Sequence, residues 1–180
     1  MYREIVCAGF GGQGIMVMGK LLAQAAMKEM KEITWMPSHG AEVRGGTAHS
    51  MVVISDSEIA SASILEPDDC IIMNRPSFLK FEQLVKKGGL MIVNSSLVED
   101  NPKRDDIKIV RIPATERAVE LGDIRIANMI ALGAYQKIAK VVSMEDLIKV
   151  LEITIPKHRH NLIPLNKKAL KEGARLADVS

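Results

Sequence analysis

The sequence is short of aromatic residues, of excess charge and of long apolar runs. Aromatic residues make up 3% of the 180 residues and the formal net charge is +2, so the chain lacks a base-stacking surface and a strongly cationic field. We therefore expect no nucleic-acid partner. No segment approaches the ~18 consecutive apolar residues of a membrane-spanning helix, and the first residues lack the basic and apolar regions of a signal peptide. We expect a cytoplasmic protein without membrane contact.

Cysteine is equally scarce. Cys7 and Cys70 lie far apart in the chain and no Cys-x-x-Cys spacing occurs, which argues against an iron–sulfur cluster, a zinc ribbon or a redox dithiol within this chain. His158 and His160 have no third ligand at a suitable spacing, so we predict no metal site. If the protein serves electron transfer, another chain carries the metal. We predict no catalytic residue in this chain.

Apolar residues, at 47% of the chain, suffice for a hydrophobic core without disulfides or structural metal. Short, continuous apolar runs predict strands that are buried on both faces, and they alternate with segments of helical periodicity. We therefore expect an α/β fold: one domain over residues 1–180, with a three-layer α/β/α arrangement and a mostly parallel sheet. The predicted strands are residues 4–8, 32–36, 47–55, 70–73, 90–93 and 107–112, and the predicted helices are residues 14–26, 77–87, 116–121, 124–140, 144–151 and 166–177. Ser143 is predicted to cap one of these helices, and residues 38–46 and 156–164 are predicted to be irregular.

A glycine-rich turn joins the first predicted strand to the first predicted helix. Residues 9–14 fit the pattern G-x-G-x-x-G in the strand–turn–helix context of a Rossmann-like start. Exposed N–H groups and the positive end of the helix dipole favour an anion such as a phosphate. The second strand, however, ends without the carboxylate that a dinucleotide site uses to hold the ribose. The alternative is that these glycines serve only close packing of strand and helix.

A second glycine-rich loop carries charge. Glu42 and Arg44 lie between Gly40 and the pair Gly45 and Gly46, an arrangement that suggests recognition because a fixed charge sits on a flexible backbone. An arginine fork can bind a carboxylate or a phosphate at two points. The alternative is a solvated turn in which Arg44 pairs with Glu42.

These segments resemble the gamma subunit, or gamma domain, of the 2-oxoacid:ferredoxin oxidoreductases. The resemblance rests on residues 9–14, 37–56, 113–116 and 127–133, which recur in order across most of the chain. The sequence Pro-Ser-His-Gly-Ala-Glu of residues 37–42 looks most like that of the 2-oxoglutarate type, with His39 and Ala41 in place of the expected Tyr and Pro. The family also includes pyruvate, 2-oxoisovalerate and indolepyruvate enzymes.

The resemblance implies a subunit that assists chemistry on its neighbours. The family oxidises a 2-oxoacid to acyl-coenzyme A and CO2 with thiamine diphosphate, and passes electrons through iron–sulfur clusters to ferredoxin. We expect alpha-, beta- and delta-type partner subunits, no cofactor held by this chain alone, an inactive isolated chain, and self-association as a homodimer when partners are absent. The residues expected near coenzyme A or a partner are Gly11, Gly12, Gln13, Glu42, Arg44, Gly45 and Gly46.

Two other functions stay open on the sequence alone. One is an autonomous nucleotide-binding α/β oxidoreductase built on the glycine turn, and the other is an assembly scaffold without ligand contact. Two polar residues are expected in or near the interior. His49 is expected to be half-buried in a strand without a catalytic role. Asn128 interrupts an apolar helix and is expected to bond to the segment 113–116 or across an interface.

Overall fold

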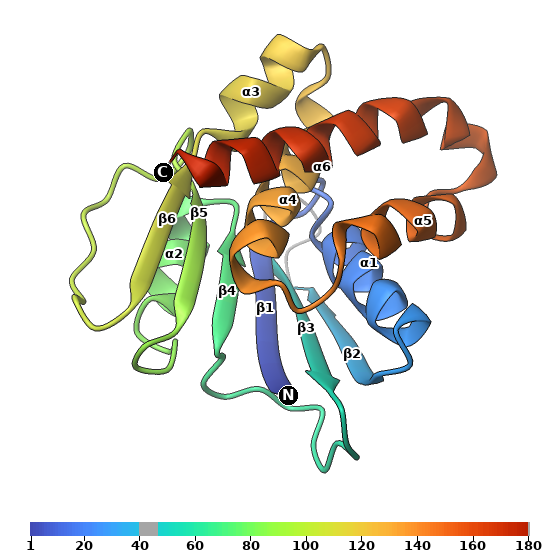
Figure 1. Ribbon diagram of the computed structural model, residues 1–180. Helices are drawn as coiled ribbons and strands as arrows, with labels where there is room; N and C mark the ends of the chain where they lie inside the picture. Colours follow the sequence, from blue (N-terminus) through green and yellow to red (C-terminus); the bar gives the residue numbers. More distant parts are fainter. Residues whose placement is uncertain (40–46, 180) are drawn as a thin grey trace.

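Six strands form one twisted sheet in the computed structural model, which describes residues 1–39 and 47–179 (Figure 1). The order of the strands across the sheet is β2-β3-β1-β4-β5-β6. Each strand is rich in β-branched or other apolar residues, and β4 and β5 are buried over their whole length. The strands are β1 (Tyr2–Phe10), β2 (Glu32–His39), β3 (Thr47–Ser55), β4 (Asp69–Ile72), β5 (Leu90–Asn94) and β6 (Lys108–Ile112).

The sheet is mostly parallel, as predicted. Strands β1, β4, β5 and β6 run parallel to one another, with Val6 beside Cys70 and Ile71 beside Ile92. Strands β2 and β3 are antiparallel additions at one edge. The carboxyl ends of the four parallel strands therefore meet at a single edge of the sheet, the edge where open α/β sheets bind their ligands.

Helices cover the two faces of the sheet unequally, which confirms the three-layer prediction in an asymmetric form. Helices α1, α4, α5 and α6 pack on one face, whereas α2 alone covers part of the other (Figure 1). The α-helices are α1 (Ile15–Lys28), α2 (Arg75–Phe81), α3 (Ala114–Leu121), α4 (Ala127–Ala139), α5 (Met144–Thr154) and α6 (Ile163–Asp178). Two 3-10 helices, η1 (Ile124–Ile126) and η2 (Lys157–Leu162), connect them.

Strand β1 separates two apolar cores. Ile5 and Cys7 face the layer of four helices, while Val6 and Ala8 face α2. All four side chains are fully buried, in keeping with the continuous apolar run of the sequence. The two cores fix the sheet between its layers and leave the carboxyl edge as the place for irregular segments.

Several predicted boundaries are wrong for local reasons. Helix α2 begins at Arg75, because Asn74 caps it by accepting a hydrogen bond from the N–H of Ser77 at 3.0 Å, and it ends at Phe81, short of residue 87. Strand β2 continues to His39 as the antiparallel partner of β3, so residues 38 and 39 are not irregular. Residues 157–162, predicted to be irregular, form η2 and lead directly into α6.

Candidate functional site

The carboxyl edge of the sheet gathers the ends of four strands. The glycine turn follows β1, Met73 follows β4, Asn94 ends β5 and Pro113 follows β6. Segments far apart in the sequence therefore meet around the start of α1. This edge also brings together the end of β2, the start of β3 and the first turn of α4, whereas the rest of β3 and α4 runs away from it.

Gln13 closes the glycine turn upon itself. Its side-chain Oε1 accepts a hydrogen bond from the N–H of Phe10 at 2.7 Å, and its Nε2 donates to the carbonyl of Met73 at 3.2 Å. The amide thus joins the ends of β1 and β4 where the two strands diverge. Gln13, expected to contact a ligand, lies in the turn with both amide atoms already bonded.

Two glycines of the turn adopt positive φ. Gly12 has φ of 90° and Gly14 has φ of 73°. Residues that have a Cβ rarely adopt these backbone conformations. No atom of the described residues lies within 4 Å of the position that a Cβ would take at Gly11 or Gly12, so among these residues this part of the turn is open to an incoming group. A Cβ at Gly14 would overlap Asn128.

The first turn of α1 has unpaired amides. Gly14 precedes the helix without a side-chain cap, and the first turn contains no acidic residue. Among the described residues, the N–H groups of Ile15, Met16 and Val17 have no hydrogen-bond partner. Unpaired N–H groups and the helix dipole make this end of α1 suited to an anion.

Asn128 supports the turn from α4. Its Nδ2 donates to the carbonyl of Gly14 at 3.3 Å, and its Oδ1 accepts from the N–H of Met129 at 2.9 Å. The expected bond to residues 113–116 is therefore wrong. The reason is the position of α4, whose first turn lies against the start of α1.

Asn94 holds the segment 113–116 instead. Its Oδ1 accepts from the N–H groups of Ala114 at 3.1 Å and Thr115 at 3.3 Å, and its Nδ2 donates to Thr115 Oγ1 at 2.9 Å. Asn94 is fully buried. Sequence reasoning missed it, although a polar residue that directly follows the apolar run of residues 90–93 was a usable signal.

Three cavities surround the turn and have Gly12 in common. Their volumes are about 170, 250 and 310 Å³. Two arginines that the sequence analysis did not single out as ligand residues line them: Arg125 from η1 and Arg159 from η2. Arg125 pairs with Asp123 through Nη2 and Oδ2 at 2.7 Å, whereas Arg159 has no carboxylate partner among the described residues.

Of the segment that contains the second glycine-rich loop, the described site includes only the residue that precedes the loop, His39. His39 ends β2 and lines the cavity of about 310 Å³ together with Gly11, Gly12 and Arg159. Four predicted contact residues lie outside the described residues: Glu42, Arg44, Gly45 and Gly46. His49 lies half-buried in β3, as expected, and burial together with nearby Lys80 lowers its pKa.

The residues present do not fit an iron–sulfur cluster or another metal. Cys7 and Cys70 are fully buried on opposite faces of the sheet, and burial raises the pKa of the Cys7 thiol to about 12. Neither thiol is thus available as a thiolate. Among residues 1–39 and 47–179, no three His, Cys, Asp or Glu side chains gather as a metal site, and no helix is long and apolar enough to cross a membrane.

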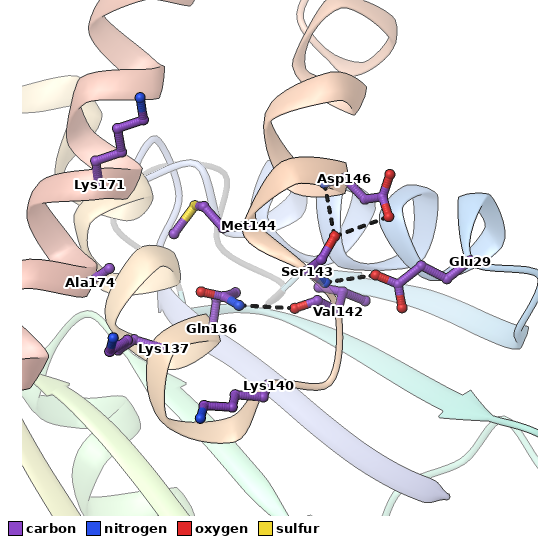
Figure 2. A pocket seen from close by; sticks show the side chains of 10 residues that line it. All are labelled: Glu29, Gln136, Lys137, Lys140, Val142, Ser143, Met144, Asp146, Lys171 and Ala174. Carbon is purple, nitrogen blue, oxygen red and sulfur yellow. Dashed lines mark hydrogen bonds between the residues drawn. The ribbon is translucent and has the colours of Figure 1, made fainter.

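A larger cavity lies away from the turn. Its volume is about 850 Å³ and it opens between the end of α4, the start of α5 and α6 (Figure 2). The ammonium groups of Lys140 and Lys171 point to opposite ends of the view and do not converge on one point. The side chain of Gln136 is bonded to the carbonyl of Val142 at 3.1 Å, and Lys137 pairs with Asp178 at 3.3 Å.

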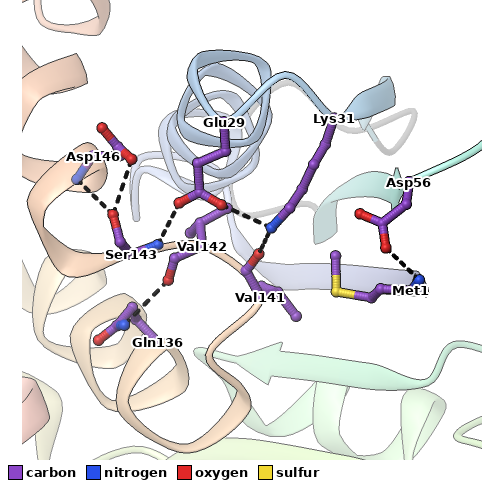
Figure 3. Close-up of polar contacts among 9 residues, drawn as sticks. All are labelled: Met1, Glu29, Lys31, Asp56, Gln136, Val141, Val142, Ser143 and Asp146. Carbon is purple, nitrogen blue, oxygen red and sulfur yellow. Dashed lines mark hydrogen bonds and ion pairs between the residues drawn. The ribbon is translucent and has the colours of Figure 1, made fainter.

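The polar groups beside this cavity hold the α4–α5 connection in place (Figure 3). Lys31 donates to Glu29 and to the carbonyl of Val141, both at 2.7 Å. Glu29 in turn accepts from the N–H of Ser143 at 2.7 Å. Ser143 caps α5 by accepting from the N–H of Asp146 at 3.0 Å, as the sequence predicted. These polar groups are thus engaged in structural bonds, and we place the candidate site at the glycine turn.

Comparison with known proteins identifies the family. Residues 4–176 match the family model described as pyruvate ferredoxin/flavodoxin oxidoreductase. The 2-oxoglutarate synthase subunit KorC of Methanocaldococcus jannaschii is 35% identical over 172 residues, which cover 93% of this chain and 92% of that protein.

Solved structures agree in fold. The gamma subunit of a keto/oxoacid ferredoxin oxidoreductase from Geobacter sulfurreducens superposes with a TM-score of 0.85 at 29% identity, over 99% of both chains. A 2-oxoglutarate:ferredoxin oxidoreductase from Magnetococcus marinus, solved with 2-oxoglutarate, coenzyme A and succinyl-CoA bound, gives a TM-score of 0.89 at 24% identity. The match covers 99% of this chain and 31% of that longer chain, and it shows a shared fold.

Proposed function

The chain belongs to the pyruvate ferredoxin/flavodoxin oxidoreductase family, and we propose that it serves as the gamma subunit of a 2-oxoglutarate:ferredoxin oxidoreductase that converts the oxoacid to acyl-coenzyme A and CO2. Support for 2-oxoglutarate comes from the sequence of residues 37–42 and from the KorC relative. We propose that residues 1–180 act as one domain in the cytoplasm, beside alpha-, beta- and delta-type subunits that bear thiamine diphosphate and iron–sulfur clusters and deliver electrons to ferredoxin.

The observation that carries this proposal is the uncapped start of α1. Among the described residues, there is open space at Gly11 and Gly12, the N–H groups of residues 15–17 are unpaired, and the first turn has no acidic side chain. These features suit a phosphate. Coenzyme A has phosphates and is the acyl acceptor of this reaction class. The residues present therefore fit its phosphate end.

In this proposal the residues of this chain bind and orient coenzyme A. The Gly11–Gly14 backbone and the N–H groups of α1 hold the phosphates, and Arg159 adds positive charge from η2. Gln13 and Asn128 keep the turn in shape without contacting the ligand themselves. When bound, coenzyme A supplies a thiol that takes up the acyl group formed on the companion chains.

Two substitutions test the glycine turn. Gly12→Asp places a carboxylate where a phosphate is expected, and Gly88→Asp is the matched control, because Gly88 also has positive φ, at 78°, and open space around it. In the assembled complex we expect Gly12→Asp to raise the KM for coenzyme A by about tenfold or more through charge repulsion. We expect an unchanged KM for the 2-oxoacid and unchanged kinetics for Gly88→Asp.

The outcomes separate the remaining alternatives. An unchanged KM for coenzyme A in an intact Gly12→Asp complex would contradict the ligand contact and favour an assembly scaffold. Turnover of a nucleotide substrate by the isolated chain would favour the autonomous oxidoreductase instead.

A further inference from the structure

Strand β2 is an unprotected edge of the sheet. It lies at one end of the strand order and, among the described residues, pairs only with β3 (Figure 1). It is eight residues long and has no lysine or arginine, and its one acidic residue, Glu32, is the first. The opposite edge strand, β6, is five residues long and has Lys108 and Arg111. Short length and basic side chains protect an edge from further pairing, so β6 is protected and β2 is open to another strand.

The free hydrogen-bonding groups of β2 follow from the alternation of the ladder. The carbonyls of Glu4 and Ala8 in β1 point toward β4, where they accept from N–H groups at 2.9 and 2.8 Å. Odd-numbered residues of β1 therefore bond to β3, and the same alternation continues across β3 to β2. The backbone groups of β2 that point away from the sheet are consequently those of Ile33, Trp35, Pro37 and His39. Proline is tolerated at such an outward position because it needs no N–H there.

Exposed apolar side chains accompany these backbone groups. Trp35 is 36% exposed and Met36 is 38% exposed, on opposite faces of β2. The Trp35 indole donates to Ser50 Oγ of β3 at 2.8 Å, which fixes the ring beside the edge. Met27 in the last turn of α1 and Met30 just before β2 are also exposed. Exposed apolar side chains that gather beside an open strand are typical of a protein–protein contact.

The side chains of β2 complement one another when two copies run antiparallel about a two-fold axis beside Met36. On one face of the joined sheet, Met36 then lies opposite Met36 of the second copy, and Thr34 lies opposite Ser38. On the other face Trp35 lies opposite Pro37. Apolar side chains thus meet apolar side chains and hydroxyls meet hydroxyls, the kinds of cross-strand pair that stabilise a sheet.

The backbone fits the same register. Each pair of Ile33 with His39 of the second copy makes two main-chain hydrogen bonds, and each pair of Trp35 with Pro37 makes one because proline lacks the N–H. The paired segments are residues 33–39 of both chains, joined by about six such bonds. Glu32 lies outside these segments, so the pairing opposes no like charges.

We propose that β2 is the contact surface for a second copy of this chain, and that two chains join their sheets through antiparallel β2 strands. This contact gives the self-association expected in the absence of partners a defined surface. The contact closes on itself, because it is two-fold symmetric and each chain has one open β2 edge. Neither the surface nor its test involves the glycine turn, so failure of this proposal leaves the proposed function standing.

Sedimentation of the full chain without companion subunits tests the contact. We expect a concentration-dependent dimer with twice the mass of the chain. Met36→Lys places two like charges opposite each other at the axis and removes an apolar pair, so it should raise the dissociation constant of the dimer about tenfold. Leu84→Lys is the matched control, because Leu84 has a similar exposure of 36% and lies outside β2. It should leave the dissociation constant unchanged.

Disulfide cross-linking tests the register. Residues that face each other in a non-hydrogen-bonded pair have Cα atoms about 4.5 Å apart, within the range of a disulfide. Met36→Cys should therefore give a covalent dimer on mild oxidation. Thr34→Cys, on the same face but two residues from the axis, should not. The native thiols of Cys7 and Cys70 are fully buried and do not compete.

Several outcomes would overturn the proposal. They are a chain that stays monomeric at all concentrations, a dimer that Met36→Lys weakens no more than Leu84→Lys does, and cross-linking through Thr34→Cys as efficient as through Met36→Cys. A monomeric chain whose β2 amides become protected from hydrogen exchange only in the complex with companion subunits would overturn it in favour of an extended segment of a companion.

Discussion

Side-chain amides build the candidate site at the scale of single residues. Gln13, Asn94 and Asn128 each bond to backbone groups at the carboxyl edge, and together they fix the turn after β1, the end of β4 and the start of α3. The groups that we propose to face a ligand are mostly backbone N–H groups, which have no partner among the described residues. The hydrogen bonds of the side-chain amides therefore hold the loops in place, and the backbone N–H groups at the start of α1 remain available to an anion.

A partly buried ion pair between Arg3 and Asp69, at the opposite edge of the sheet, joins β1 to β4. Asp69 is fully buried and accepts from Arg3 Nη2 at 2.8 Å and from the Tyr135 hydroxyl at 2.7 Å. Burial raises the pKa of Asp69, while Tyr135 and Arg3 act against that rise. Removing Arg3 leaves the carboxylate buried beside a single donor.

We predict that Arg3→Met lowers the free energy of unfolding by about 3 kcal/mol near neutral pH. The loss should shrink as the pH falls, because the pKa of Asp69, already raised, rises further without Arg3 and a protonated carboxyl no longer carries an unpaired charge. Urea unfolding between neutral and mildly acidic pH measures this. Arg75→Met, which breaks the exposed pair of Arg75 and Asp100, is the control and should change stability by less than about 1 kcal/mol. A loss that does not depend on pH would contradict the electrostatic explanation.

The sequence pointed to the candidate site where its residues form a continuous motif. Gly11, Gly12 and Gln13 lie in the glycine turn, whose spacing has a local meaning, and their contact with a ligand stays a prediction. Arg125 and Arg159 were not assigned to the site, because they come from short 3-10 helices that reach the turn only through the packing of α4, α5 and α6. No local pattern marks such residues in a single sequence.

At the scale of elements, the close approach of α4 and α6 positions the helical layer. Gly133 of α4 lies against the backbone of Leu170, and Gly173 of α6 lies against the backbone of Ile130. A Cβ at either glycine would overlap a carbonyl oxygen of the facing helix. The start of α4, which holds Asn128 against Gly14, therefore depends on glycines well away from the site.

We predict that Gly133→Ala destabilises the protein by about 2 kcal/mol, although alanine favours a helix by ~1 kcal/mol over glycine. Overpacking against a backbone that cannot move aside is the reason. Thermal or urea unfolding measures the change, with Gly11→Ala as the control, since Gly11 has open space around it and should change stability by less than about 0.5 kcal/mol. A stabilised Gly133→Ala variant would show that the two helices are not in close contact.

Element types were more predictable than their ends. Apolar runs gave all six strands, and Ser143 with Asp146 gave the start of α5. The predicted end of β2, at residue 36, was wrong because the last residues of this strand are extended only through their pairing with β3. The sequence predictions did not identify the β2–β3 pair as antiparallel, because strand direction depends on which strands become neighbours.

At the scale of the whole molecule, the described residues form an edge that suits a ligand and gather no set of metal-ligating side chains. Its two thiols are buried, its described residues gather no metal ligands, and its polar groups at the carboxyl edge are used for shape. The four-helix face supports that edge through α1 and α4. We propose that such a molecule contributes to catalysis through the ligand that it binds, and that its partner subunits perform the chemistry.

Ferredoxin reduction driven by a 2-oxoacid and coenzyme A is the measurement that tests this account most directly. The complex isolated without oxygen through a tag on this chain should reduce ferredoxin, faster with 2-oxoglutarate than with pyruvate or 2-oxoisovalerate, and the separated chain should reduce none. Turnover by the separated chain, or its full activity in cells that lack any thiamine-dependent companion, would contradict the account.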